Sequence, residues 1–186
     1  MLLSVRERGE AVATWRWIHV HLMETLASWV PTTPEMEVKL LFGAHVWDMA
    51  QHADALGKRT HELRMPLQHS LEPCEPYRQL FANLALMQDT AERLACFYDG
   101  VLVALAARYR TYLERTDALL DAPTVRILHH ITAEQARMRH EYQVLLDQLP
   151  ALLLSQREPV EQFLSCEAAL DDFVVHRPER TSVGAS

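Results

Sequence analysis

Residues 33–56 decide the fold of this chain, and they read TPEMEVKLLFGAHVWDMAQHADAL. Thr33, Pro34 and Glu35 form a typical helix start, because a threonine side chain can cap the first free N–H groups and proline and acidic residues suit the first turn. After this start, apolar residues recur at every third or fourth position, which is the period of an amphipathic helix. The stretch therefore predicts a helix over residues 34–64.

Prolines mark the ends of further segments of helix length along the chain. Pro31 ends one segment, residues 65–76 form a linker with three prolines, and Pro123 and Pro150 bound another segment. No window shows the period-two alternation of a half-buried strand. The further helices that we expect, with a kink at Gly100 in the second of them, cover residues 6–30, 77–118, 122–149 and 158–174.

These segments predict an all-α protein, an up-and-down bundle of four long helices with a short fifth helix at the C-terminal end. One domain over residues 1–176 suits the length of 186 residues, and the polar residues 177–186 are expected to form a flexible tail. Glycine is scarce, at 5 residues, which agrees with long helices and argues against glycine-rich barrels, sandwiches and dinucleotide-binding sheets.

Charge and cysteine content exclude several classes of protein. The net charge of −7 argues against a nucleic-acid partner, and no apolar run is long enough for a membrane span. Charged residues follow directly after the first few positions, which argues against a signal peptide. Three scattered cysteines without a Cys-x-x-Cys pair predict no disulfide framework and no zinc ribbon. We therefore expect a cytoplasmic protein.

Three polar residues lie on the inward side of the predicted helix 34–64. On a helical projection His45 and His52 fall near the middle of the apolar face, and Asp48 lies about 70° to one side. On the predicted helix 122–149, Glu134 flanks the apolar face and His130 lies four residues before it. A buried charged group needs a partner or a metal ion, because its desolvation otherwise costs several kcal/mol. Imidazole and carboxylate suit iron, manganese or zinc, and a hydrogen-bonded network is the alternative.

Together with Glu134 and the sequence DAPTVRIL at 121–128, residues 32–56 resemble bacterial ferritin-like proteins. The resemblance covers about residues 10–149. Ferritin-like proteins hold two metal ions between a glutamate from each of two helices and a Glu-x-x-His pair from each of the other two.

The resemblance implies a set of metal ligands and also shows where this chain departs from the family. The implied ligands are Glu24, His52, Asp99 and Glu134. Met49 stands where helix 34–64 would carry its glutamate, and Arg137 stands where helix 122–149 would carry its histidine. A guanidinium at that place would repel a metal ion and could pair with Glu134 instead.

Three functions are compatible with this pattern. A metal-dependent oxidoreductase or hydroxylase acting on a small molecule would hold iron or manganese with His45, Asp48, His52 and Glu134, with His130 as a fifth or outer ligand. A metal-free ferritin-like protein would contain a His–Asp–Arg–Glu network there and bind a small molecule or a partner subunit, with Arg137 holding a ligand carboxylate or phosphate. An iron-storage cage is disfavoured by the linker at 65–76 and the replaced ligands.

Apolar residues around the helices suggest a homodimer.

Other conspicuous residues have structural interpretations. His19 lies near the centre of the apolar face of helix 6–30 and is expected to be a core histidine with satisfied hydrogen bonds. Trp47 is expected to pack in the interior or to wall a cavity beside Asp48. Cys96 lies within a helix without a basic neighbour in sequence and is expected to be unreactive.

Overall fold

The computed structural model describes residues 2–154 and 157–170, and within these ranges it is all-helical and contains no β-strand. The predicted all-α class is confirmed. None of the helices in the described ranges is long and apolar enough to cross a membrane. The elements in chain order are α1 (Val5–Trp29), η1 (Val30–Thr32), α2 (Met36–Glu62), α3 (Glu75–Ala85), α4 (Thr90–Ala95), η2 (Cys96–Val101), α5 (Leu102–Arg115), α6 (Ala122–Gln148), η3 (Pro150–Leu154) and α7 (Arg157–Ala168).

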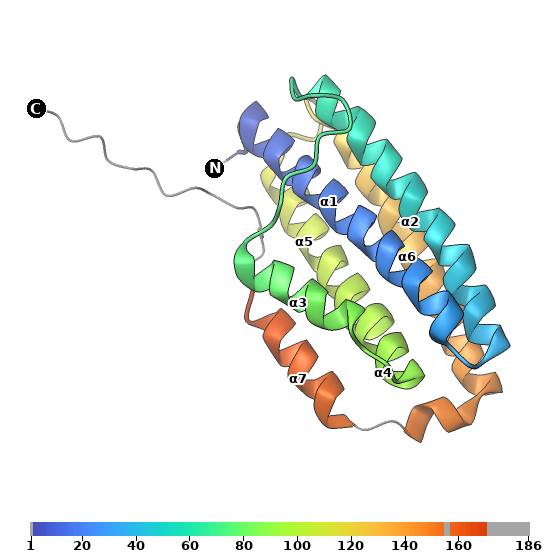
Figure 1. The fold of residues 1–186 in the computed structure, drawn as a ribbon. Helices are drawn as coiled ribbons and strands as arrows, with labels where there is room; N and C mark the ends of the chain where they lie inside the picture. Colours follow the sequence, from blue (N-terminus) through green and yellow to red (C-terminus); the bar gives the residue numbers. More distant parts are fainter. Residues whose placement is uncertain (1, 155–156, 171–186) are drawn as a thin grey trace, which may run out of the picture.

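The long helices lie side by side, as Figure 1 shows for α1, α2, α6 and the continuous segment from α4 through η2 to α5. Helices α1 and α2 are joined by the short η1 turn and pack against each other, and α6 packs against α2. Helices α3 and α7 lie to one side of the long helices. This arrangement brings α2 and α6, which are far apart in sequence, next to each other.

Three of the predicted helices, 6–30, 34–64 and 122–149, correspond to α1, α2 and α6. Helix α7 accounts for the first part of the predicted helix 158–174. The last predicted positions of that helix, and the predicted tail at 177–186, lie outside the described residues.

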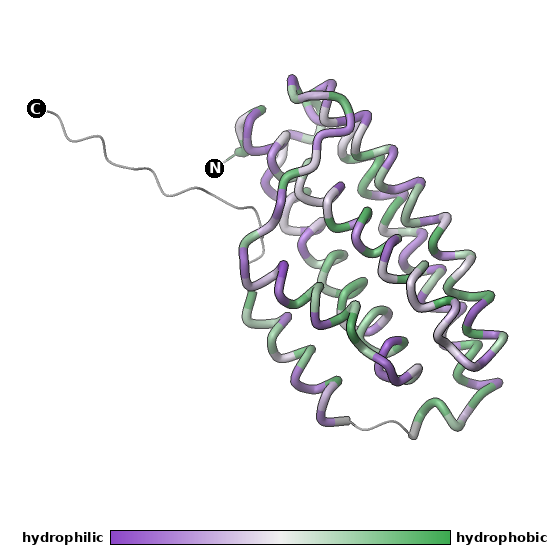
Figure 2. The backbone as a smooth tube through the Cα atoms, viewed as in Figure 1, coloured by the Kyte–Doolittle hydropathy of each residue, from purple (hydrophilic) through white to green (hydrophobic). Residues whose placement is uncertain are grey.

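The interior between the long helices contains aromatic and aliphatic side chains. Trp15 packs edge-on against Tyr109 and Tyr112, with ring centroids 5.1 Å and 4.9 Å apart. His19 is fully buried and has partners for both ring nitrogens, which confirms that it is a core histidine. Hydrophobic and hydrophilic positions alternate along each long helix in Figure 2, as burial of one helix face requires.

The start of α2 differs from the prediction. The N-cap position is Glu35, and no side chain caps the first N–H groups. Thr33 instead donates its hydroxyl to the carbonyl oxygen of Trp29 at 2.8 Å and accepts from the Arg93 guanidinium at 3.1 Å. The threonine therefore stabilises the end of α1 rather than the beginning of α2.

The prediction of one helix over 77–118 is wrong, because the chain breaks between α3 and α4. The carboxylate of Asp89 accepts from the backbone N–H of Glu92 at 3.0 Å and so caps α4. The buried Arg93 donates to the carbonyl oxygen of Met87 at 2.8 Å, so this carbonyl group between the two helices has a hydrogen-bond partner. The Asp-x-x-Glu spacing is a helix-start pattern that apolar periodicity does not reveal.

The kink predicted at Gly100 falls in η2, which is a π-helical turn. A Cβ atom at Gly100 would lie 3.0 Å from Leu164 and 3.1 Å from Phe163, both on α7. The glycine therefore allows α7 to pack closely against this turn. A largely buried ion pair between Arg108 and Glu167 also joins α5 to α7.

A buried carboxylate at the start of α6 joins the ends of three helices. Asp121 is fully buried and accepts from Arg59 of α2 at 2.8 Å and from Tyr112 of α5 at 2.6 Å. It also accepts from the hydroxyl groups of Thr116 and Thr124. These contacts fix the position of α6 along α2, which sets the pairing of the polar residues further along both helices.

Candidate functional site

Three cross-helix pairs connect α2 and α6, and we call them the α2/α6 ladder. His45 Nε2 lies 2.8 Å from Glu141 Oε2, and His52 Nε2 lies 2.7 Å from Glu134 Oε2. Between them, the Arg137 guanidinium donates to Asp48 at 2.8 Å. The antiparallel course of the helices explains the order, because positions that ascend along α2 meet positions that descend along α6. All predicted metal ligands on α2 therefore have partners on α6.

Arg137 lies at the centre of the ladder's carboxylates. Its Nη2 bonds Asp48 and its Nη1 bonds Glu141 at 2.9 Å, whereas the closest oxygen of Glu134 is 3.9 Å away. The hydrogen bonds from Arg137 to Asp48 and Glu141 raise the pKa of the guanidinium above its ordinary value. The pairing expected between Arg137 and Glu134 is therefore weaker than the pairing to Asp48. The prediction that Arg137 binds a ligand anion stays a prediction.

His45 has partners on two sides. Its Nδ1 lies 2.7 Å from the hydroxyl of Tyr98 in η2, and its Nε2 faces Glu141. Burial lowers the pKa of His45, although the hydrogen bond to Glu141 opposes this shift. Burial acts to raise the pKa of Glu141, but bonds from His45 and Arg137 hold that pKa below its ordinary value. A neutral imidazole therefore lies against an ionised carboxylate.

The remaining predicted ligands lie apart from the centre of the ladder. His130 is exposed, and its Nε2 is 3.6 Å from Glu134. Asp99 interacts with Arg139 at 3.5 Å and accepts from the Tyr142 hydroxyl at 3.2 Å. These positions do not bring His130 and Asp99 together with His45.

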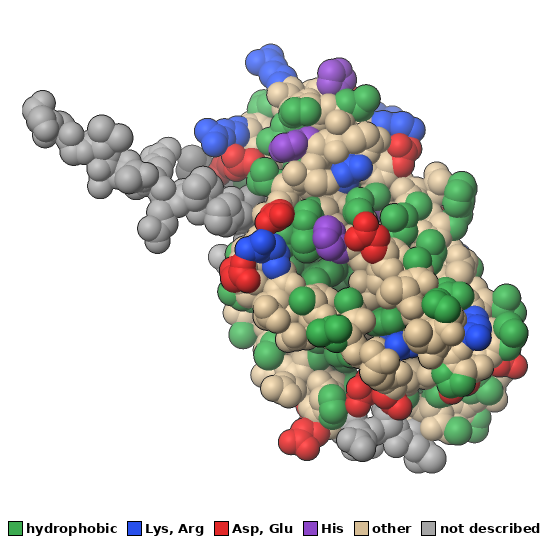
Figure 3. Space-filling view, in the orientation of Figure 1, with side chains coloured by type: hydrophobic (Ala, Val, Ile, Leu, Met, Phe, Trp, Pro, Cys, Tyr) green, Lys and Arg blue, Asp and Glu red, His purple; other side chains and the backbone are tan. Residues whose placement is uncertain are grey.

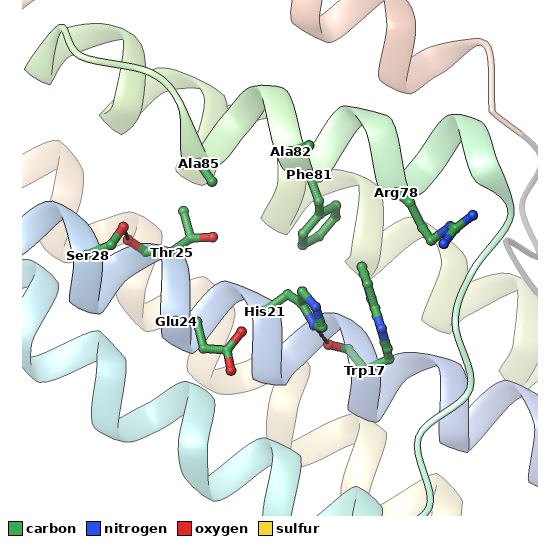
Figure 4. A pocket seen from close by; sticks show the side chains of 9 residues that line it. All are labelled: Trp17, His21, Glu24, Thr25, Ser28, Arg78, Phe81, Ala82 and Ala85. Atoms are coloured by element: carbon green, nitrogen blue, oxygen red, sulfur yellow. Dashed lines mark hydrogen bonds between the residues drawn. The ribbon is translucent and has the colours of Figure 1, made fainter.

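Glu24 lies in a groove of about 440 Å³ between α1 and α3. Figure 4 shows His21 and Trp17 on α1 beside Phe81 on α3, with Glu24 further along α1 and its carboxylate directed away from α3. His21 stacks on Trp17, with ring centroids 3.5 Å apart, and donates from Nδ1 to the Trp17 carbonyl oxygen. We call this the α1/α3 groove. Glu24 is exposed, and within the described residues no hydrogen bond or ion pair holds its carboxylate.

A second set of polar side chains lies in the core, on the inner side of the ladder. His19 Nε2 is 2.7 Å from the Tyr109 hydroxyl, and His19 Nδ1 is 3.3 Å from the sulfur of Met49. The rings of His19 and His52 are perpendicular, with centroids 5.0 Å apart. Burial raises the pKa of the Tyr109 hydroxyl, and the buried Gln135 acts against this shift. We call these five residues the interior cluster.

The interior cluster contains polar atoms without partners. Within the described ranges, His52 Nδ1 and both polar atoms of the Gln135 side chain are buried and form no hydrogen bond. Such orphaned atoms are rare, because a buried polar group without a partner costs about 1–3 kcal/mol. The cluster is therefore the part of the core where a bound species would be stabilising.

An iron or manganese ion does not fit the ladder. The Arg137 guanidinium lies among the carboxylates that would have to bind the ion, and like charges repel. No group of three or more His, Cys, Asp or Glu side chains in the described part of the chain is arranged to hold a metal ion. The predicted ligand set, from His45 to Glu134, therefore stays a prediction without a matching geometry.

Several residues of these two sites were not predicted. Glu141 was recognisable as the residue one helical turn beyond Arg137, since positions four apart on a helix are neighbours. Tyr98 and Tyr109 lie on an apolar face, where a tyrosine is indistinguishable from a packing residue until its hydroxyl partner is known. Their polar roles depend on which helices lie opposite, and the sequence carries no signal for that.

The outer surface carries mixed charge. On the face in Figure 3, acidic and basic side chains are interspersed with apolar ones. Trp47 is 66% exposed on α2, so the prediction that it packs in the interior is wrong. Met36 and Leu40 are exposed on the same helix. The predicted homodimer stays a prediction.

No known protein family, curated protein or solved structure matches this chain. Functional conclusions therefore depend on the two polar sites and the α1/α3 groove.

Proposed function

We propose that this chain is a binding protein built on a ferritin-like helical bundle, in which the α2/α6 ladder takes the place of an iron centre. The observation that carries the proposal is the position of Arg137, whose guanidinium bonds Asp48 on α2 and Glu141 on α6. A permanent cation among the carboxylates offsets part of the negative charge that metal ions would otherwise balance, and it repels metal cations. The ladder is thus a substitute for metal ligation and not a catalytic iron site.

The arrangement supports a structural role for the ladder. Each rung joins α2 to α6, and the two outer rungs use a neutral imidazole whose pKa burial lowers. A neutral imidazole can donate one N–H to a carboxylate without adding a second buried charge. The ladder therefore holds the helices together around the core and leaves ligand binding to other surfaces.

The α1/α3 groove is the ligand site that we propose for this function. Its volume of about 440 Å³ lies within the range of small-molecule sites, and its walls include the aromatic rings of Trp17 and Phe81. Arg78 at its edge is paired with Glu72 and Glu75. Glu24 therefore contributes net negative charge beside aromatic walls, which suits an aromatic amine in its ammonium form.

Metal analysis of the purified protein tests the replacement of the iron centre. We expect no stoichiometric iron or manganese in the wild type, and no change in the His52→Ala and Glu134→Ala variants. Stoichiometric iron or manganese that is lost in these variants would overturn the proposal and favour the oxidoreductase.

Calorimetric titration with phenethylamine tests the ligand site, with ethylbenzene as a neutral probe of similar shape. Because the ammonium would pair with Glu24, the Glu24→Gln variant should lose about tenfold or more in affinity for the amine, which corresponds to a charge-assisted contact of about 1.4 kcal/mol or more. Glu37→Gln on the outside of α2 is the matched control. Equal affinity of wild type and Glu24→Gln would refute the groove as the site, and so would the absence of amine binding.

A further inference from the structure

One buried ring nitrogen of His52 has no hydrogen-bond partner among the described residues. The side chain is 1% exposed, its Nε2 lies 2.7 Å from the Glu134 carboxylate, and its Nδ1 has no partner in the described part of the chain. An ionised carboxylate only accepts, so the proton of a neutral His52 lies on Nε2. The Nδ1 atom then carries a buried lone pair without a partner, which could accept a proton from a donor or bind an electrophile.

His19 and Met49 supply two further electron-pair donors near the His52 ring. Met49 is three residues before His52 on α2, and its sulfur is 3.3 Å from His19 Nδ1. The other nitrogen of His19 is held at 2.7 Å by the Tyr109 hydroxyl. When His19 Nε2–H donates to Tyr109, Nδ1 and the thioether sulfur face each other with their lone pairs. An electrophile between them would bond both atoms.

The spacing of the two imidazoles suits one shared ion. Two imidazoles that bind one ion through nitrogens at about 2.0 Å have ring centres about 5–6 Å apart. The ring centroids of His19 and His52 are 5.0 Å apart, with the planes nearly perpendicular. All three side chains are 1% exposed or less, so an ion there would be shielded from water.

We propose that the interior cluster binds one Cu(I) ion through His19 Nδ1, Met49 Sδ and His52 Nδ1. A thioether is a soft donor that selects Cu(I), and imidazole also suits copper. The three donors are neutral, which suits an ion of single charge better than the divalent ions that prefer carboxylates. The proposed site shares His52 with the predicted iron site, but its other donors, His19 and Met49, lie on the core side of that ring and include no carboxylate.

The surroundings of the three donors support metal binding. Metal-binding histidines commonly donate their second N–H to a carboxylate or another acceptor, and Glu134 and Tyr109 occupy these places for His52 and His19. Burial lowers the pKa of both histidines, which keeps the rings in the neutral form that a metal requires. Glu134 is 25% exposed, and it supplies a compensating negative charge on the other side of the His52 ring from the ion.

Anaerobic competition between the protein and the Cu(I) chelator bicinchoninate tests the proposal. The Cys74→Ser/Cys166→Ser variant is the reference, because exposed thiols also bind Cu(I) and these two cysteines are not fully buried. We expect one Cu(I) per chain. Met49→Leu conserves side-chain volume and removes the sulfur, and it should lower the affinity about tenfold or more, as should His52→Gln. His130→Ala is the matched control, since this exposed histidine also lies beside Glu134 and should leave the affinity unchanged.

X-ray absorption at the copper edge identifies the ligands directly. We expect one sulfur and two nitrogen scatterers in the reference protein, and loss of the sulfur scatterer in Met49→Leu. If the chelator removes all Cu(I) from the protein, the proposal is overturned, and a buried water molecule bonded to His52 Nδ1 is favoured instead. Cu(I) binding that is insensitive to Met49→Leu and His52→Gln would also overturn it. Neither result affects the ladder, because iron and manganese content and Cu(I) affinity are measured separately.

Discussion

The guanidinium of Arg137 on α6 lies 2.8 Å from the carboxylate of Asp48 on α2, although the two residues are separated by 89 positions in the sequence. Arg137 also bonds Glu141 on its own helix, so one cation joins carboxylates from both sides of the helix pair. This contact connects Asp48 to the His45–Glu141 pair of the α2/α6 ladder.

Removal of the cation should destabilise the protein modestly. Arg137→Met leaves Asp48 and Glu141 without their partner, and because the guanidinium is 43% exposed we expect a loss of about 1 kcal/mol in the free energy of unfolding. Urea denaturation measures this loss. Arg139→Met is the matched control, because Arg139 is similarly exposed and its contact with Asp99 is longer, at 3.5 Å. An equal loss in both variants would show that Arg137 has no special role.

The buried carboxylate at the start of α6 should be far more sensitive. Asp121→Asn removes the charge that accepts from Arg59, Tyr112 and two threonines, and it leaves the buried Arg59 cation with only the exposed Glu62 as a counter-ion. We expect a loss of about 3–5 kcal/mol, measured by urea denaturation. Asp117→Asn is the control, since Asp117 accepts only from exposed backbone N–H groups. A loss below about 1 kcal/mol for Asp121→Asn would contradict the role of Asp121 in joining α6 to α2 and α5.

Stability should fall as the pH is lowered from about 7 to about 5. Burial lowers the pKa of His19, His45 and His52 in the folded state, so the unfolded chain, with an ordinary histidine pKa of about 6.5, binds more protons in this range. The stabilisation is complete above the unfolded pKa and is lost as the pH falls toward the folded pKa values. Urea denaturation at several pH values should show this slope, and His52→Gln should reduce it. The exposed His61→Gln should not. A slope that is the same in all three proteins would contradict the prediction.

Two glycines on helices should respond differently to alanine. A Cβ atom at Gly43 on α2 would meet no heavy atom within 4 Å, so Gly43→Ala should raise the free energy of unfolding by about 0.5–1 kcal/mol. A Cβ atom at Gly100 would press on Leu164 and Phe163 of α7, so Gly100→Ala should gain less or lose stability. Thermal denaturation of both variants checks the difference. A larger gain at Gly100 than at Gly43 would contradict the close packing of α7.

The extent of the long helices was predictable from sequence, because proline positions and apolar periodicity are local signals. The break between α3 and α4 was missed because Asp89 and the buried Arg93 create it through capping and a tertiary hydrogen bond. The polar faces of α2 and α6 were also predictable, and so the residues His45, Asp48, His52 and Glu134 were singled out. Their partners were not, because pairing depends on the position of α6 along α2. That position is set by packing and by the contacts of Asp121, which are non-local.

The interior cluster was also not predictable as a site from the sequence. His19 was recognisable as a core histidine, but its proximity to Met49 and His52 comes from the packing of α1 on α2. A methionine on an apolar helix face carries no sequence signal that separates a ligand from a packing residue. The polar atoms of His52 and Gln135 that lack partners distinguish this part of the core, and a missing partner is a property of the folded structure.

An anaerobic titration of the purified protein with ferrous iron, followed by aeration, tests the central claim most directly. Because the Arg137 guanidinium pairs with the ladder carboxylates and would repel a metal cation, we predict no stoichiometric ferrous binding and no ultraviolet band of oxo-bridged iron after exposure to air. Tight binding of one or two ferrous ions per chain, with the oxo-iron band appearing on aeration, would contradict the claim that the α2/α6 ladder replaces the iron centre.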